Sequence, residues 1–367
     1  MKRLYFLDNL RAFVVFLVIV LHGAITYMAY APPWWYVLDP NNSLFFTALV
    51  ILVDVSIMMV MFFVAGYFAY PSLVKRGSGQ FIKDKFVRIG LPWIFGALLL
   101  APPTAYMIYF SRGAPVTLAQ FWAGDFWGVA YQQSVYWFLG ILFLQFALLA
   151  LAYAASERLR GLNRSAASPS WLFFTGFAAL MTLAFLGMNQ LYPPDTWTHV
   201  YLFVFQPLRL PLYFGYFILG LMAYQRGWFT EEGYTPGWGW VALFVVSGVL
   251  YLSYRFTIPT IMQTTLPLQA GNAILFNVYC LAGLMAGIAI FRRAVNGNGW
   301  FWASQARNSY GIYYVHPLIL YPLAYLFVPL QLSVFVKAPL VILLGWLLSW
   351  GVSAVILTRL PGLRRIF

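Results

Sequence analysis

The chain has 367 residues, of which 62% are hydrophobic, 20% aromatic and only 8% charged. Soluble domains carry about 25% charged residues, so this composition excludes an ordinary water-soluble protein. A net charge of +13 is also typical of proteins that bind nucleic acids. Here, however, the positive residues fall in short connections between apolar segments. We therefore predict an all-α, polytopic protein with the lipid bilayer, and no nucleic acid, as its partner. The single cysteine, Cys280, excludes an intrachain disulfide and a cysteine-rich metal site, and we expect no metal.

Ten apolar segments are long enough to cross the hydrocarbon core as helices, which takes about 20 residues. In chain order they are 9–30, 44–70, 90–110, 135–155, 171–190, 200–224, 237–255, 271–291, 309–329 and 338–358. The N-terminus also resembles a cleaved signal peptide, with a basic "MKR" before an apolar stretch. Asp8 and Arg11 interrupt that pattern, so we favour an uncleaved first span. We expect a single integral-membrane domain over 1–367, without a soluble extracytoplasmic domain.

Lysines and arginines between the spans set the orientation, because cytoplasmic connections carry the excess of positive charge. With the N-terminus inside, the outer segments hold only Arg112, Arg255 and Lys337. This asymmetry predicts that both termini are cytoplasmic and that 156–170 is a cytoplasmic linker. The outer connection 111–134 contains the aromatic stretch "FWAGDFWGVAY", which anchors the chain at the interface or lines a pocket.

The first span has Arg11 near its start and His22 near its end. Eleven helical residues turn through three full turns plus about 20°, so both side chains face one side, about 16 Å apart along the axis. Asp8 either caps the helix or pairs with Arg11 at a spacing of three residues. An imidazole within the membrane is a candidate general base, and a cation at the water boundary suits a phosphate. Acyl-coenzyme A fits this arrangement as a co-substrate, with its phosphates at Arg11 and its thioester near His22; we expect no permanently bound cofactor.

The other titratable residues within the predicted spans are Asp54, Arg209 and His316. Ionisable groups are costly in a membrane and often mark functional sites. Each also has a structural alternative: Asp54 pairs with Arg209, His316 hydrogen-bonds a neighbouring helix, and Arg11 snorkels to the interface.

The basic stretch at 75–88 lies on the same predicted side as Arg11. Lys85 and Arg88, at the start of the third span, are candidates to bind the phosphates of the donor. The alternative is that these charges only set the orientation of the chain.

Five stretches of the chain resemble, in order, the acyltransferase 3 family of integral-membrane acyltransferases. The opening "LDNLRAFVVFLVIVLH" has the arginine, ten intervening residues and histidine of the first helix of that family. The others are "MFFVAGYFAY" at 61–70, "FIKDKFVRIGLPW" at 81–93, "SVYWFLGILF" at 134–143 and "NSYGIYYVHPLIL" at 308–320. Asn9 and Ala65 depart from the glycine and serine that are common in the family. Within this family, the "LDNLR" opening resembles the subgroup that acts on periplasmic glucans more than it resembles other members.

The resemblance implies transfer of an acyl group from cytoplasmic acyl-CoA to a hydroxyl of a carbohydrate, such as glucan O-acetylation or succinylation, at the outer side of a bacterial inner membrane. It implies that His22 is the base, or forms an acyl-histidine intermediate, that Arg11 positions the donor, and that Asp8 holds Arg11. The supporting candidates are Asp54, His316 and Trp137. Asp54 is expected to orient an imidazole, as acids do in hydrolytic triads.

The competing hypothesis is a multi-span transporter or flippase of a sugar or lipid-linked substrate, with Asp54 and His316 as a proton relay. Many such folds have inverted repeats, and the sequence does not show them clearly.

Overall fold

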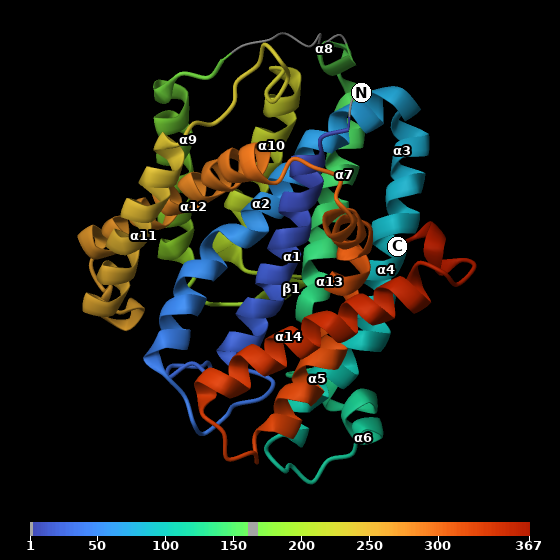
Figure 1. Ribbon diagram of the computed structural model, residues 1–367, viewed down its shortest axis with the longest axis vertical. Helices are drawn as coiled ribbons and strands as arrows, with labels where there is room; N and C mark the ends of the chain where they lie inside the picture. The colour runs from blue at the N-terminus through green and yellow to red at the C-terminus, as the bar shows by residue number, and fades with distance from the viewer. Residues whose placement is uncertain (1–2, 161–167) are drawn as a thin grey trace. The chain divides into compact units, whose positions relative to one another are not determined.

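The computed structural model describes residues 3–160 and 168–367, and Figure 1 shows that helices make up most of this part of the chain. Residues 1–2 and residues 161–167 of the predicted linker lie outside the described residues. These ranges include Lys2 and Arg164. The helices are α1 Tyr5–Ile25, α2 Leu44–Arg76, α3 Ser78–Lys85, α4 Leu91–Phe95, α5 Ala101–Phe110, α6 Leu118–Ala123, α7 Trp137–Ala155, α8 Glu157–Arg160, α9 Trp171–Leu191, α10 Leu210–Gln225, α11 Gly239–Thr257, α12 Leu266–Ala294, α13 Trp300–Phe327 and α14 Val334–Val352. Strands β1 Thr198–Val200 and β2 Phe203–Phe205 form an antiparallel hairpin with Thr198 opposite Phe205. The all-α prediction is confirmed.

Eight helical runs among the described residues are long and apolar enough to cross a membrane. They are Tyr5–Ile25, Leu44–Arg76, Ser78–Phe110, Ser134–Ala155, Trp171–Leu191, Gly239–Thr257, Leu266–Ala294 and Val334–Leu357. The two remaining predicted spans correspond to α10, which has only 16 residues, and α13, whose 28 residues include several tyrosines and two prolines that lower its hydropathy. The difference between ten and eight therefore comes from these two helices.

The predicted span at 200–224 begins later than expected. Residues 203–205 belong to the hairpin, Pro207–Arg209 form a short 3-10 turn, and α10 begins at Leu210. Tyr201 has a φ of 52°, in the left-handed region that ends regular structure. Proline suits the first turn of a helix, where its missing N–H leaves no hydrogen bond unmade, and Pro207 and Pro211 lie at such starts. Arg209 consequently precedes the helix, with its guanidinium 5.6 Å from the centroid of the Phe276 ring.

The third predicted span, at 90–110, is the second part of a longer helical run, Ser78–Phe110. Two π-helical turns, Phe86–Gly90 and Gly96–Leu100, interrupt this run. They precede Pro92 and Pro102, and a widened turn relieves the clash between a proline ring and the carbonyl four residues earlier.

The described residues form two compact units. The first contains Met1–Arg11, Val55–Asp84 and Leu142–Asn298, and the second contains Ala12–Asp54, Lys85–Ile141 and Gly299–Phe367. In the first unit, a side chain at Gly66 would overlap the backbone of Phe217, so α2 and α10 approach closely there. In the second unit, a side chain at Gly311 would overlap Ser353. Such close approach at small residues is how helices pack in membranes, where no hydrophobic force drives them together.

Candidate functional site

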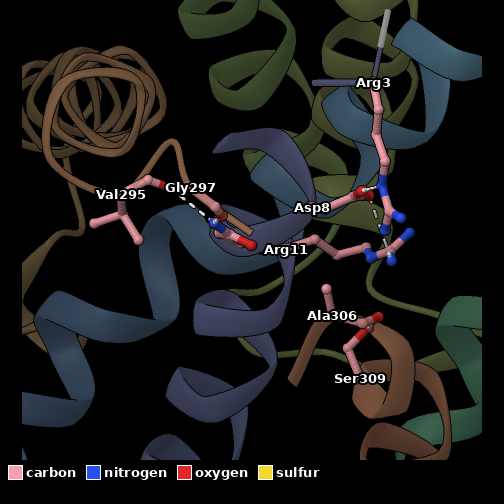
Figure 2. A network of polar contacts seen from close by, with 8 residues as sticks. Arg3, Asp8, Arg11, Val295, Gly297, Ala306 and Ser309 are labelled. Atoms are coloured by element: carbon pink, nitrogen blue, oxygen red, sulfur yellow. Dashed lines mark hydrogen bonds and ion pairs between the residues drawn. The ribbon is translucent and has the colours of Figure 1, made fainter. Parts of the chain in front are cut away.

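The carboxylate of Asp8 holds two arginines at the start of α1. Its Oδ2 accepts a hydrogen bond from Nε of Arg3 at 2.8 Å, and its Oδ1 lies 3.8 Å from Nη2 of Arg11. Figure 2 shows the two guanidinium groups reaching the carboxylate from different directions. Of the two roles expected for Asp8, the pairing with Arg11 is therefore the one present. The side chain of Arg11 is 37% exposed, although its Nε is buried.

Asn9 anchors the start of α1 to the end of α12. Its amide nitrogen donates to the carbonyl oxygens of Val295, at 2.7 Å, and Gly297, at 3.0 Å (Figure 2). The last carbonyls of a helix have no partner within the helix, and Val295 is the C-cap residue that follows α12. Sequence reasoning missed this role and noted Asn9 only as a departure from a family pattern. The available signal was a lone amide at the start of an apolar helix.

Two histidines from helices far apart in sequence meet in the second unit. Nδ1 of His22, in the last turn of α1, lies 2.9 Å from Nε2 of His316, in α13. The two rings are stacked, with centroids 5.2 Å apart and an interplanar angle of 17°. Nδ1 of His316 lies 2.7 Å from the carbonyl oxygen of Tyr313, one turn earlier in α13, and the His316 side chain is fully buried. The sequence indicated both histidines but not that they touch.

This chain of hydrogen bonds fixes where the protons lie. A carbonyl oxygen only accepts, so Nδ1 of His316 carries a proton and donates to Tyr313. In neutral His316 the other nitrogen, Nε2, is then an acceptor, and Nδ1 of His22 donates to it. In neutral His22 this leaves Nε2 without a proton and with its lone pair available. The tautomers follow from the hydrogen-bond partners, and they present Nε2 of His22 as a base.

The expected role of Asp54 in orienting an imidazole stays a prediction. The three histidine nitrogens in this chain of hydrogen bonds are engaged with each other and with a backbone carbonyl, not with a carboxylate. Asp54 lies half-buried in the middle of α2, and Trp137 is the first residue of α7. Their supporting roles stay predictions.

The candidates for binding phosphate lie at the start of the third helical run. Lys85 is the last residue of α3, and Arg88 lies in the following π-helical turn with an exposed side chain. The backbone carbonyl of Arg88 accepts a hydrogen bond from the hydroxyl of Tyr310 at 2.8 Å, so its backbone is held against α13. The phosphate role of both residues stays a prediction.

The connection after α1 folds against the histidine pair. Its segment 33–39, which we call the strap, places the ring of Trp35 with its centroid 5.6 Å from that of His22. Tyr36 stacks on Tyr321 of α13 with centroids 4.1 Å apart. Burial raises the pKa of Tyr36 far above its ordinary value, so its hydroxyl stays protonated and donates to Oε1 of Gln132 at 2.8 Å. Aromatic rings thus cover one side of the imidazole.

The predicted outer connection 111–134 holds the strap in place. Nη2 of Arg112 donates to the carbonyl oxygens of Pro33, at 2.7 Å, and Trp35, at 2.9 Å. The hydroxyl of Ser111 donates to the carbonyl oxygen of Tyr36 at 2.9 Å. The strap is therefore fixed by its backbone, not only by ring packing.

A buried ion pair secures the end of the strap. Nζ of Lys337 lies 2.9 Å from Oδ2 of Asp39, and both side chains are completely buried. Nζ also donates to the carbonyl oxygen of Val328 at 3.0 Å. The prediction that Lys337 lies in an outer connecting segment was wrong, because the residue belongs to α14. A buried charge is costly without a partner, and here the partner is 298 residues away in sequence, where hydropathy cannot detect it.

A hollow of about 500 Å³ lies in the same unit, lined by residues 40–42 and 331–334. None of the predicted site residues lines it. Among the residues that the structure describes, no group of three or more His, Cys, Asp or Glu side chains is placed to hold a metal ion.

Comparison with known proteins relates nearly the whole chain to one family. The family model Acyl_transf_3, described as an acyltransferase domain, matches residues 4–357. Glucans biosynthesis protein C of Escherichia coli K12 is 28% identical over 123 residues, which is 34% of this chain and 30% of that protein. The protein of the same name from Shigella boydii serotype 4 gives the same identity over the same length. The alignment thus covers less than a third of these relatives, and no solved structure gives a significant match.

Proposed function

The chain belongs to the acyltransferase 3 family, and from this premise we propose that it moves an acyl group from cytoplasmic acyl-CoA to a hydroxyl group of a carbohydrate on the other side of the membrane. Its helices and its family make it an integral-membrane acyltransferase that transfers groups other than amino-acyl groups. The donor, the acceptor and the sides of the membrane belong to the proposal.

The observation that carries this proposal is the histidine pair. Nδ1 of His22 is engaged with His316, and Nε2 is left as a lone-pair acceptor. As the hydroxyl oxygen of the acceptor bonds to the thioester carbon, its proton passes to Nε2. The carbon–sulfur bond then breaks, and the departing thiolate takes that proton from His22. General-base catalysis of this kind is typically worth 10²–10⁴-fold in rate.

Arg11 is the proposed anchor for the phosphates of the donor. It lies on the same continuous helix as His22, about 16 Å away along the axis. Its side chain is partly exposed and lies beside Asp8, and guanidinium groups bind phosphate oxygens through paired N–H donors. Lys85 and Arg88 are proposed to assist.

The proposed acceptor is a glucan. The two relatives named above are called glucans biosynthesis protein C, which supports a glucan acceptor for this chain as well. Acetyl and succinyl groups are the proposed acyl groups, and a bacterial inner membrane is the proposed location. The excess of lysine and arginine in one set of connections supports cytoplasmic termini.

The test uses purified protein, labelled acetyl-CoA or succinyl-CoA, and a β-glucan. Wild-type protein is expected to label the glucan, and His22→Ala is expected to lose 10²–10⁴-fold in rate. The matched control is His199→Ala, since His199 is an exposed histidine on the β1–β2 hairpin. Full labelling by His22→Ala would refute the role of the base. Substrate flux without any acyl transfer would favour a transporter.

A further inference from the structure

Trp35 has a buried hydrogen-bond donor with no partner. Its side chain is 4% exposed, and its Nε1 has no hydrogen-bond partner among the residues that the structure describes. Its nearest aromatic neighbours include His22 and Tyr321, each with its ring centroid 5.6 Å away. An indole N–H can only donate, so the missing partner is an acceptor.

Such a donor needs an explanation, because leaving it unpaired costs about 1–3 kcal/mol. Other tryptophans of this unit have partners: Nε1 of Trp93 donates to Gln133 at 3.0 Å, and Nε1 of Trp350 to Ser304 at 3.2 Å. In the first unit, Trp228 is also unpaired, but its neighbouring rings are phenylalanines and Tyr234, with no histidine among them. Trp35 is distinguished by its contact with a candidate base.

We propose that Nε1–H of Trp35 hydrogen-bonds the carbonyl oxygen of the acyl thioester and stabilises the oxyanion that forms there. This inference deepens the proposed function and rests on it. When the acceptor oxygen bonds to the thioester carbon and its proton passes to His22, the π electrons of the carbonyl move onto its oxygen. That oxygen becomes an oxyanion and accepts the indole hydrogen bond more strongly. As the carbon–sulfur bond breaks, the carbonyl re-forms and the thiolate takes the proton from His22.

The surroundings of Trp35 suit this role because they hold it in place before substrate arrives. Its backbone carbonyl is fixed by Arg112 at 2.9 Å, and the strap ends in the buried pair of Asp39 and Lys337. A donor that is already fixed and shielded from water stabilises charge without reorganising during the reaction. Because the indole and the imidazole are neighbours, a substrate group bound against His22 also lies next to Trp35.

The experiment measures steady-state acyl transfer by Trp35→Phe, which keeps an aromatic ring and removes the N–H. Removing one oxyanion donor typically lowers kcat by 10²–10³-fold, and we expect such a fall with little change in the KM for the acceptor. The control is Trp34→Phe, the same substitution at the preceding residue, whose side chain is 44% exposed. It should transfer at the wild-type rate. If Trp35→Phe does not fold, 3-benzothienylalanine at position 35 replaces the N–H with sulfur at nearly the same shape and is expected to give the same loss.

The possible results distinguish a failure of the oxyanion role of Trp35 from a failure of the proposed function. Wild-type kcat in the Trp35→Phe or benzothienylalanine protein would overturn the oxyanion role. The N–H would then only contact the face of a neighbouring aromatic ring. A raised acceptor KM with unchanged kcat would also overturn it, and would indicate stacking against the sugar. If wild-type and Trp34→Phe proteins both fail to transfer acyl groups, the proposed function fails instead.

Discussion

His316 is expected to act through His22, as a positioning residue. His316→Ala removes the acceptor for the Nδ1–H of His22, which lies 2.9 Å from it. Leaving a buried donor unpaired costs about 1–3 kcal/mol. Each 1.36 kcal/mol lost from transition-state stabilisation is a tenfold change in rate. We therefore expect kcat to fall roughly 10- to 100-fold, less than for His22→Ala.

A conservative variant distinguishes positioning from packing. In His316→Gln, the side-chain oxygen can still accept from His22, so most of the activity should return. If His316 served only in packing, His316→Gln and His316→Met would have similar activity, because the two side chains have similar volumes. The second readout is the tautomer of His22, observed by ¹⁵N NMR of histidine-labelled protein. We expect protonation at Nδ1 in wild-type protein and a mixture in His316→Ala. Unchanged kcat together with an unchanged tautomer in His316→Ala would refute this reasoning.

Three further predictions concern the ends of the site. Arg11→Ala should raise the KM for acyl-CoA more than the KM for the glucan, and an unchanged donor KM would mean that Arg11 only snorkels. Lys337→Met should lower the free energy of unfolding, measured in a thermal or denaturant melt, by about 3–5 kcal/mol, because it leaves Asp39 buried and unpaired. The double variant Lys337→Met, Asp39→Leu should recover much of the lost stability, and no recovery would contradict the pairing. Asn9→Leu should lower the melting temperature through the lost anchor to α12 while leaving the acceptor KM unchanged, and a selective change in that KM would argue against a structural role.

The sequence allowed the helical class and most of the long apolar helices to be predicted, with the pairing of Asp8 and Arg11 as one of two alternatives. These features depend on composition or on spacing within one helix, and both are visible locally. The span at 200–224 was partly wrong, because a hairpin and a proline turn are as apolar as a helix here. Hydropathy measures transfer to lipid and does not identify a left-handed residue such as Tyr201.

The contacts between distant segments could not be predicted. His22 and His316 are 294 residues apart, and Lys337 and Asp39 are 298 apart. No periodicity within a helix connects such pairs. Trp35 was missed for a different reason: a tryptophan in an aromatic-rich connection resembles an interfacial anchor. Its role depends on an unpaired N–H beside a histidine, and that neighbour is brought to it only by the tertiary fold.

The most direct test of the central claim is vectorial acyl transfer in proteoliposomes. Radiolabelled acyl-CoA is supplied on the side of the cytoplasmic termini, and glucan is supplied only on the opposite side. We predict labelled glucan across the membrane with the wild-type protein and its His199→Ala control, and a loss of 10²–10⁴-fold with His22→Ala. Equal labelling by wild-type and His22→Ala proteins, or label on glucan only when both substrates share one side, would contradict it.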